Sequence, residues 1–375
     1  MLLASERMLL PEGAALLPGW VRIEEDRIVE TGSGTVPAGA EWVEGILAPG
    51  WVDVHNHGGG GATFVTEDPG EARRVIAAHR AHGTTTVMAS LVTGSIADLR
   101  RQITALAPLV DAGELAGIHL EGPWLAEEYK GAHDAALLAD PDPKVVTELL
   151  DLAHGTIRMV TIAPERRRAP ETIELLCRRG VTAAVGHTAA DFDRARDAVE
   201  RGARGATHLF NAMPELRHRA PGPALALWQD PRVTIELIFD GVHVRSELAA
   251  WVMATAPGRV ALVTDAMAAA GAEDGDYHLG GLAVTVSGGV ARLTGATTIA
   301  GSTLTLDRAV RNAVAQGVAP AVAMRAASAV PARYQGLTDV GELTAGKRAD
   351  VIELADELVV RRVFTRGRWW PAATA

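Results

Sequence analysis

The chain of 375 residues has one cysteine, no long hydrophobic run and no block of concentrated positive charge. The single cysteine, Cys177, cannot form an internal disulfide, which fits a protein of a reducing compartment. No apolar run approaches the roughly 18 to 20 residues that a membrane-spanning helix needs. Glu6 and Arg7 interrupt the apolar start of the chain, where a secretory signal needs an unbroken segment. These absences predict a soluble, cytoplasmic protein.

The formal net charge is −10, which argues against a surface that binds nucleic acid or an anionic membrane. No cluster of Lys and Arg with interleaved aromatic residues contradicts this expectation. We therefore expect no nucleic-acid or membrane partner. An anionic substrate would have to be bound by a local basic pocket.

Short apolar segments that read as strands alternate with segments of helical periodicity along most of the chain. The apolar segments have near-continuous Val, Ile, Leu and Ala, which is typical of parallel strands covered on both faces. This alternation over residues 48–341 predicts an α/β fold, a (β/α)₈ TIM barrel. The expected strands are residues 50–54, 84–89, 115–120, 157–163, 181–186, 205–210, 233–239 and 259–264.

The two ends of the chain differ from the barrel, since they contain strand patterns joined by charged turns and no long helix. Neither end has enough strands for a stable sheet of its own. Residues 1–47 and 342–375 are therefore predicted to pair into one small β-sandwich domain against the barrel.

Polar residues occur at or near the ends of most predicted strands, which is where barrel enzymes place their active sites. His55 and His57 are two residues apart and so point to the same face of a strand, although this pair alone favours a metal site and a structural role about equally. Imidazole and carboxylate groups together suit Zn²⁺, with Fe²⁺ as the alternative. The further residues of this set are Glu121, His187, His208 within the sixth strand, His243 in the loop after the seventh strand, and Asp265.

Asp265 follows the last predicted strand, where a carboxylate can move a proton between water and a leaving group. The alternative is that Asp265 caps a helix at residues 266–270. For five other histidines, structural or solvent roles are expected, because they lie within helical patterns, inside a strand or in loops. They are His79, His82, His119, His154 and His278.

Several motifs occur in an order and spacing that resemble the N-acetylglucosamine-6-phosphate deacetylases, which are members of the amidohydrolase superfamily. The resemblance extends from about residue 40 to the C-terminus. HLEGP and THLFNAM together are specific, whereas the HxH pattern alone indicates only the superfamily. The motifs are HNHG, HLEGPWL, KGAH, AVGHT, THLFNAM, DGVHV, LVTDAM and IAGSTLTLDRAVRN.

The resemblance implies that Glu121, His187 and His208 hold the principal catalytic metal. Because His55 and His57 are present, it also implies room for a second ion, so that each subunit would hold one or two divalent metal ions.

The resemblance also implies an activity: removal of the acetyl group from N-acetyl-D-glucosamine 6-phosphate, which yields D-glucosamine 6-phosphate and acetate, in amino-sugar catabolism and cell-wall recycling. Asp265 would be the general acid/base, and His133 would polarise or orient the acetamide carbonyl. A homodimer is expected, because Arg219 could act from a neighbouring subunit. The residues implied in substrate binding are His133, Asn211, Ala212, Arg219 and His243.

Three alternatives remain. An enzyme that prefers N-acetylgalactosamine 6-phosphate differs by one hydroxyl epimer, and the sequence does not show that contact. A cyclic-amide hydrolase of the superfamily would place a carboxylated lysine at the end of the fourth strand, where this chain has TIAPE without a lysine. A barrel that binds metal without catalysis has no need of a proton carrier such as Asp265.

Overall fold

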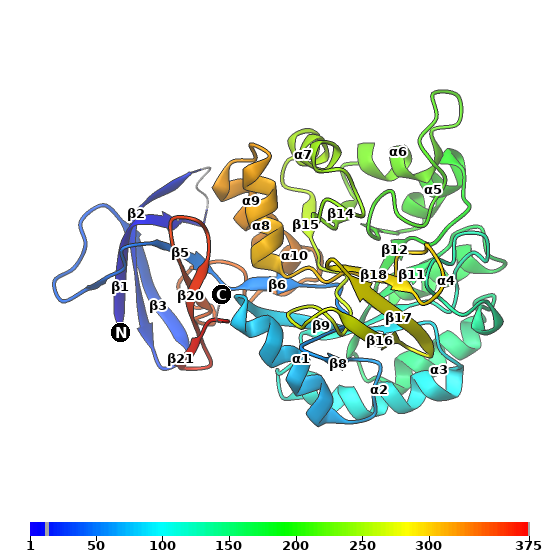
Figure 1. Cartoon of the computed structure of the whole chain (residues 1–375), viewed down its shortest axis with the longest axis horizontal. Coiled ribbons are helices and arrows are strands. Elements are labelled where there is room, and N and C mark those ends of the chain that lie inside the picture. The colour runs from blue at the N-terminus through cyan, green and yellow to red at the C-terminus, as the bar shows by residue number, and fades with distance from the viewer. Residues whose placement is uncertain (12–14, 374–375) are drawn as a thin grey trace.

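Eight parallel strands form a barrel, as the alternation of apolar segments predicts (Figure 1). The computed structural model describes residues 1–11 and 15–373. Each strand pairs with the next along the chain, and a bridge between Asn56 and Ala266 brings the first and last strand segments together. The barrel strands are β6 (Trp51–Asp53), β9 (Thr84–Val92), β10 (Gly117–Glu121), β11 (Ile157–Ile162), β12 (Thr182–Val185), β13 (Gly205–Ala206), β14 (Thr234–Leu237) and β15 (Val260–Leu262).

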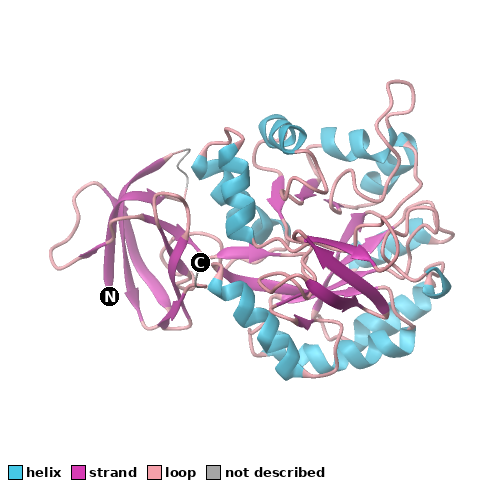
Figure 2. Ribbon diagram, in the orientation of Figure 1, coloured by secondary structure: helices cyan, strands magenta, loops and turns pink. Residues whose placement is uncertain are grey.

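Helices cover the outside of the barrel (Figure 2), so the strands are buried on both faces. Local sequence sets several helix starts: the side chains of Asp68, Ser95, Asp142 and Asp191 each accept a hydrogen bond from a backbone N–H of the first turn. The helices are α1 (Pro69–Ala81), α2 (Ile96–Asp111), α3 (Pro143–Leu152), α4 (Ala169–Arg178), α5 (Phe192–Glu200), α6 (Gly222–Gln229), α7 (Ser246–Thr255), α8 (Leu306–Ala315), α9 (Pro320–Ala326), α10 (Ala329–Tyr334) and the 3₁₀ turn η1 (Ala135–Leu137).

The sixth barrel strand is shorter than the predicted 205–210, because β13 ends at Ala206. His208 and Phe210 have φ angles of 30° and 77°, which an extended strand does not allow. The prediction that His208 lies within the strand is therefore wrong. His208 lies in the turn that follows, still at the C-terminal end of the barrel.

The two ends of the chain build one eight-stranded sheet beside the barrel, which confirms their predicted pairing (Figure 1). β5 pairs antiparallel with β19, so the early and late segments meet in the middle of the sheet. Its strands enclose an apolar cluster that includes Leu3, Val21 and Phe364. The domain boundaries at residues 47 and 342 stay a prediction. The strands are β1 (Leu2–Leu9), β2 (Leu16–Glu24), β3 (Arg27–Ser33), β4 (Glu41–Trp42), β5 (Ile46–Pro49), β19 (Val351–Leu354), β20 (Val360–Thr365) and β21 (Arg368–Pro371).

A three-stranded antiparallel sheet follows the last barrel strand, and the sequence interpretation did not include it. It consists of β16 (Gly275–Leu279), β17 (Leu282–Ser287) and β18 (Val290–Leu293). Its apolar residues pack against Met267 and Val92, which lie near the C-terminal ends of β15 and β9. A short hairpin of β7 (Gly58–Gly59) and β8 (Ala62–Thr63) lies directly after His57. Both additions therefore border the end of the barrel that holds the polar residues.

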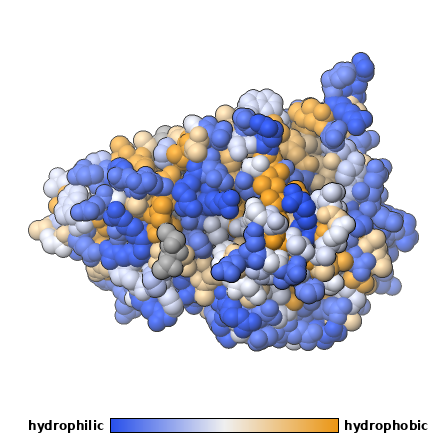
Figure 3. Space-filling view, in the orientation of Figure 1, coloured by the Kyte–Doolittle hydropathy of each residue, from blue (hydrophilic) through white to orange (hydrophobic). Residues whose placement is uncertain are grey.

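The surface is mostly polar on the face drawn in Figure 3, where apolar residues form scattered patches. In the ranges 1–11 and 15–373, none of the helices is both long and apolar enough to cross a membrane.

Candidate metal centre and active site

Glu121, the last residue of β10, is the centre of a buried polar cluster. Its Oε1 atom lies 3.3 Å from the Nε2 of His55, 3.3 Å from that of His187 and 3.2 Å from that of His208. Its Oε2 atom lies 3.1 Å from the Nε2 of His57. Residues separated by up to 153 positions in the chain thus place four imidazoles around one carboxylate, because each follows a strand of the same barrel.

The hydrogen bonds on the far side of the imidazoles fix which nitrogen faces the cluster. In three of them Nδ1 lies within hydrogen-bond distance of an oxygen that can only accept, so Nδ1 carries a proton, and in the neutral form of each imidazole the free lone pair is on Nε2. The Nδ1 partners are the Glu236 carboxylate for His55 at 2.9 Å, the Ser90 carbonyl for His57 at 3.0 Å and the Tyr129 carbonyl for His187 at 2.9 Å.

These lone pairs converge on one another and on a carboxylate. The Nε2 atoms of His55 and His57 are 3.2 Å apart, and those of His187 and His208 are 3.0 Å apart. Two groups of neighbouring ligand atoms result, one with His55, His57, Glu121 and Asp265, the other with Glu121, His133 and His187. The donor set fits a divalent cation, because several nitrogen lone pairs and two carboxylates directed at one another need positive charge between them.

The two carboxylates at the centre are ionised. Burial alone would raise the pKa of Asp265, but the charge of His55 and a hydrogen bond from His57 hold it well below its usual range. The pKa of Glu121 is likewise lowered, because His55 and the hydrogen bonds of the other imidazoles outweigh its burial. Burial would lower the pKa of His57, yet hydrogen bonds to Asp265 and Glu121 raise it to about 9. The cluster therefore attracts cations.

Asp265 lies beside the cluster, with Oδ1 3.2 Å from the Nε2 of His57. Its backbone N–H donates to the carbonyl of His55 at 2.9 Å, which holds the loop after β15 against the end of β6. Within residues 15–373 no helix begins at 266–270, so the alternative role of Asp265 as a helix cap is wrong.

Three of these residues have a left-handed backbone that side chains rarely adopt. The φ angles are 46° at His187, 30° at His208 and 48° at Asp265. Such a conformation costs on the order of 1–3 kcal/mol per residue, and the surrounding structure must maintain it. The left-handed backbone at these three residues directs their side chains into the cluster. The sequence pattern gives no sign of this conformation.

His133, in the loop after β10, lies beside Glu121 and His187. Its Nδ1 accepts a hydrogen bond from the backbone N–H of Thr93 at 3.3 Å, and its Nε2 lies 3.5 Å from Glu121 Oε2. Burial is the main cause that lowers the pKa of His133 to about 4, despite the hydrogen bond to Glu121. At neutral pH this imidazole is uncharged, and with Nδ1 as acceptor its Nε2–H is a donor that faces Glu121 at the wall of the cavity.

Two buried carboxylates that the sequence interpretation missed support the cluster from behind. Glu236 of β14 is fully buried and bonds to both His55 and the hydroxyl of Tyr334, the latter at 3.2 Å. Asp53 of β6 accepts from the Thr264 hydroxyl at 2.6 Å and from the Asn56 amide at 2.9 Å. Each is a single acidic residue inside an apolar strand, which is a sign of a buried charge in the sequence. The sequence does not indicate which residue it would contact.

A cavity of about 340 Å³ opens above the cluster. Asn211, Ala212 and His243, which the resemblance implies in substrate binding, line it. The pKa of His243 is raised, because the Asp240 carboxylate 2.6 Å from its Nδ1 outweighs its burial. The remaining lining includes residues with no expected role, namely Gly131, Ala132, Leu279, Thr297, Thr298, Ile299 and Gly301.

Arg219 is not among the described residues that line this cavity. It is exposed in the loop before α6 that projects from the molecule in Figure 1, and residues 215–220 of that loop are all exposed. The structure therefore does not bring Arg219 to the site of its own chain.

The other histidines have the structural or solvent positions that were predicted for them. His119 is buried in the barrel, between the hydroxyls of Ser90 and Thr161 at 2.9 Å each. His79 lies within hydrogen-bond distance of the Asn56 amide and the Gly58 carbonyl. His154 and His278 are exposed, and His82 faces Asp307 at 3.5 Å.

The barrel and the cluster at its C-terminal end define a metal-dependent hydrolase of the (β/α)₈ class. The amidohydrolase family model matches residues 46–370. The chain belongs to the amidohydrolase family, which confirms the predicted superfamily.

Within this family, the chain is similar to deacetylases of phosphorylated N-acetyl amino sugars. The chain is 47% identical to an N-acetyl-D-glucosamine-6-phosphate deacetylase from Mycobacterium smegmatis, solved in complex with N-acetyl-D-glucosamine-6-phosphate, with a TM-score of 0.95 over 98% of each chain. It is 36% identical to the human N-acetylglucosamine-6-phosphate deacetylase, covering 88% of this chain and 85% of that one. It is 37% identical to an N-acetylgalactosamine-6-phosphate deacetylase from Escherichia coli O157:H7, covering 86% and 87%.

Proposed function

We propose that the chain hydrolyses the acetamide bond of N-acetyl-D-glucosamine 6-phosphate to D-glucosamine 6-phosphate and acetate. The observation that carries this proposal is the position of Asp265, an ionised carboxylate 3.2 Å from His57, at the edge of a cation-attracting cluster inside a cavity. The names of the mycobacterial and human relatives support the substrate.

The cluster fits a divalent metal, for which we propose Zn²⁺, with Fe²⁺ as the alternative. Glu121, His187 and His208 would hold the principal ion, and His55 with His57 would hold a second one that shares Glu121. When bound, the ion acts as a Lewis acid and lowers the pKa of water.

Asp265 moves the proton in this proposal. As an ionised carboxylate it accepts a proton from the attacking water, whose oxygen bonds to the acetyl carbon. It then returns this proton to the sugar nitrogen as the carbon–nitrogen bond breaks, so acetate and the free amine leave. The lowered pKa of Asp265 keeps its carboxylate ionised, which is the form that can accept a proton.

His133 stabilises the charge that develops on the acetyl oxygen. Its neutral imidazole presents an Nε2–H donor beside Glu121, where the carbonyl of a bound acetamide would lie. A donor held in place before the reaction needs no reorganisation as the oxyanion forms.

The phosphate is proposed to meet His243, Asn211 and Ala212, which line the cavity. The raised pKa of His243 favours its cationic form, which suits a phosphate. Among the described lining residues there is no Lys or Arg, so we propose that Arg219 of a second subunit supplies the guanidinium in a homodimer.

The galacto epimer is the second candidate substrate, since the relative from Escherichia coli O157:H7 is named for N-acetylgalactosamine 6-phosphate and is 37% identical. The two sugars differ in one hydroxyl, and a hydrogen bond to that hydroxyl would decide between them.

One experiment tests the proposal. Purified protein is analysed for its metal content, and acetate release is then measured with N-acetylglucosamine 6-phosphate, its galacto epimer and unphosphorylated N-acetylglucosamine. We expect bound divalent metal and the highest kcat/KM with the first substrate. Metal-loaded protein that releases acetate from none of the three would overturn the proposed function, and a higher kcat/KM for the epimer would reassign the sugar.

A further inference from the structure

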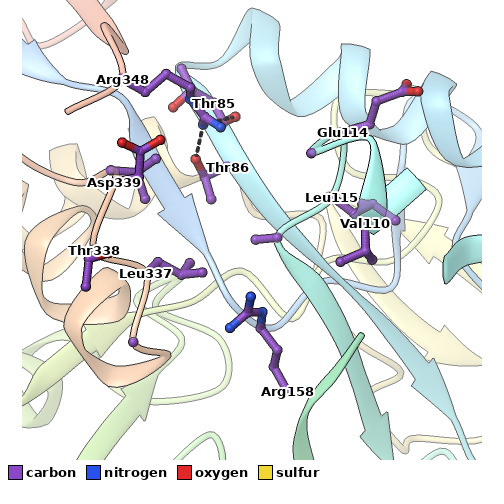
Figure 4. Close-up of a pocket in the computed structure, with 14 residues that line it drawn as sticks. Thr85, Thr86, Val110, Glu114, Leu115, Arg158, Leu337, Thr338, Asp339 and Arg348 are labelled. Atoms are coloured by element: carbon purple, nitrogen blue, oxygen red, sulfur yellow. Dashed lines mark hydrogen bonds between the residues drawn. The ribbon is translucent and has the colours of Figure 1, made fainter. Parts of the chain in front are cut away.

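A second cavity, of about 290 Å³, lies at the end of the barrel opposite the metal cluster (Figure 4). Its walls come from the start of β9 with Thr85 and Thr86, from the loop 113–116 after α2, and from Arg158 at the start of β11. Residues 336–340 and Arg348 close it on the side of the terminal sheet. It is therefore built from the N-terminal ends of the strands whose C-terminal ends form the proposed active site.

Most charged groups that line this cavity already have an ionic partner outside it. Arg348, besides its ion pair with Asp350, donates a hydrogen bond to the Thr86 hydroxyl at 2.7 Å, so its guanidinium has partners within the protein. The pairs are Glu114 with Arg73 at 2.8 Å, Asp339 with Arg27, and Arg348 with Asp350 at 2.9 Å.

Arg158 is the charged lining residue for which no ionic partner is found in the described part of the chain. Among the described residues its Nε atom is also buried without a hydrogen-bond partner. Figure 4 shows its guanidinium pointing into the cavity. A Cβ on Gly117 of the neighbouring strand would come within 2.7 Å of the Arg158 side chain, so the absence of a side chain at Gly117 gives the arginine stem its path. The half-buried arginine is thus held beside the neighbouring strand, with its Nε lacking a protein partner and its guanidinium directed into a half-open cavity.

The chemistry of the lining indicates the kind of molecule that fits. Arg158 offers a planar fork of donors that matches a carboxylate. The acidic groups of Glu114 and Asp339 at the wall disfavour a doubly charged anion, since the cavity has only one unpaired positive charge. Apolar side chains of Val110, Leu115 and Leu337 complete the wall and suit a hydrocarbon body.

We propose that this cavity is a second small-molecule site, which binds an organic monocarboxylate with a short apolar body through Arg158. The occupant would contact the barrel on one side and residues 336–340 on the other, and this segment leads back into the terminal sheet at β19. Binding is therefore expected to stabilise the folded protein, because the ligand joins two parts of the chain that are distant in sequence.

The test uses sodium butyrate as the probe and butyramide as its uncharged control, with the metal-loaded full chain. We expect butyrate to raise the midpoint of thermal unfolding and butyramide to have no effect. In Arg158→Gln the affinity for butyrate should fall at least about tenfold, since hydrogen bonds to a charged group are lost. Arg178→Gln is the matched control, because Arg178 is an exposed arginine on α4 whose side chain is 66% accessible.

A crystal of the wild-type protein soaked in butyrate locates the ligand independently of any variant. Density beside Arg158 supports the proposal even where Arg158→Gln does not fold. A butyrate effect of equal size in wild type and Arg158→Gln would place the ligand elsewhere, for example at the metal centre, and would overturn the proposal. Absence of density at Arg158 in the soaked crystal would also overturn it.

Discussion

The two ends of the barrel use charge in opposite ways. At the C-terminal end, Glu121 and Asp265 face imidazole nitrogens at 3.1–3.5 Å with their lone pairs directed at one another. At the N-terminal end, Glu114 and Asp339 are each tied to an arginine. A carboxylate paired with an arginine stabilises the fold by itself. Ligand atoms of imidazoles and carboxylates that converge on one point instead favour the binding of a metal ion. The same eight strands therefore separate a reactive end from a largely neutralised one.

Non-glycine residues with left-handed φ angles gather at the reactive end, although His154 before β11 also has one. His187, His208 and Asp265 at the reactive end have left-handed φ angles. These residues are held in place by surrounding contacts, such as the hydrogen bond from Asp265 N–H to the His55 carbonyl. We infer that part of the stability of the barrel is used to keep strained residues in position at one end.

The largest effect is expected for Glu121→Gln. Glu121 contacts every imidazole of the cluster, so its loss should remove metal binding. Activity should fall by more than about 10⁴-fold, with bound metal reduced. Metal analysis and acetate release measure the two effects. Glu128→Gln, an exposed residue of the following loop, is the control and should resemble the wild type.

Asp265→Asn should lower kcat by roughly 10³-fold, because the amide cannot accept the proton of water. The remaining ligands keep the metal, so metal content should change little. Steady-state kinetics with parallel metal analysis measure this separation. Near-normal turnover of the metal-loaded variant would contradict the role of Asp265, and Asp193→Asn on the exposed surface of α5 is the control.

Glu236→Gln should weaken metal binding by roughly 10 to 100-fold, because the carboxylate that fixes the His55 tautomer is lost. Titration with a metal chelator measures the affinity. Tyr334→Phe removes the other partner of Glu236 and should have a smaller effect. If both variants bound metal as the wild type does, Glu236 would not position His55.

The smallest effect is expected for Asp240→Asn. Without this carboxylate, burial is left to lower the pKa of His243, so the imidazole loses its proton at a lower pH than in the wild type. KM for the phosphorylated substrate should then rise several-fold at about pH 7.5, where the variant is neutral at this position. A titration of His243 by NMR checks the shift, and the KM for unphosphorylated N-acetylglucosamine should not change.

The barrel could be predicted because parallel strands buried on both faces appear as short apolar runs. All eight predicted strands are present, and the polar residues after them meet, since parallel strands end at the same side. The extent of the sixth strand was wrong, because the turn at His208 depends on a φ angle that its side chain does not indicate.

Other features depend on partners that are distant in the chain. Glu236 looks like an isolated charge in an apolar strand until the fold places it 2.9 Å from His55. The sheet of β16, β17 and β18 was missed, although Gly280–Gly281 and Gly288–Gly289 between alternating segments are hairpin signals. Those two glycine pairs were a usable signal, whereas the partner of Glu236 was not readable from order along the chain.

The pairing of β5 with β19 has a consequence for synthesis on the ribosome. β5 ends at Pro49 and its neighbour begins at Val351, so the first half of the sheet emerges about 300 residues before its partner strand. At the usual ~5–20 residues per second of translation, the edge of β5 waits roughly 15 to 60 s. During this time the unpaired edge of β5 can pair with other chains, so the protein is exposed to aggregation until β19 has been made.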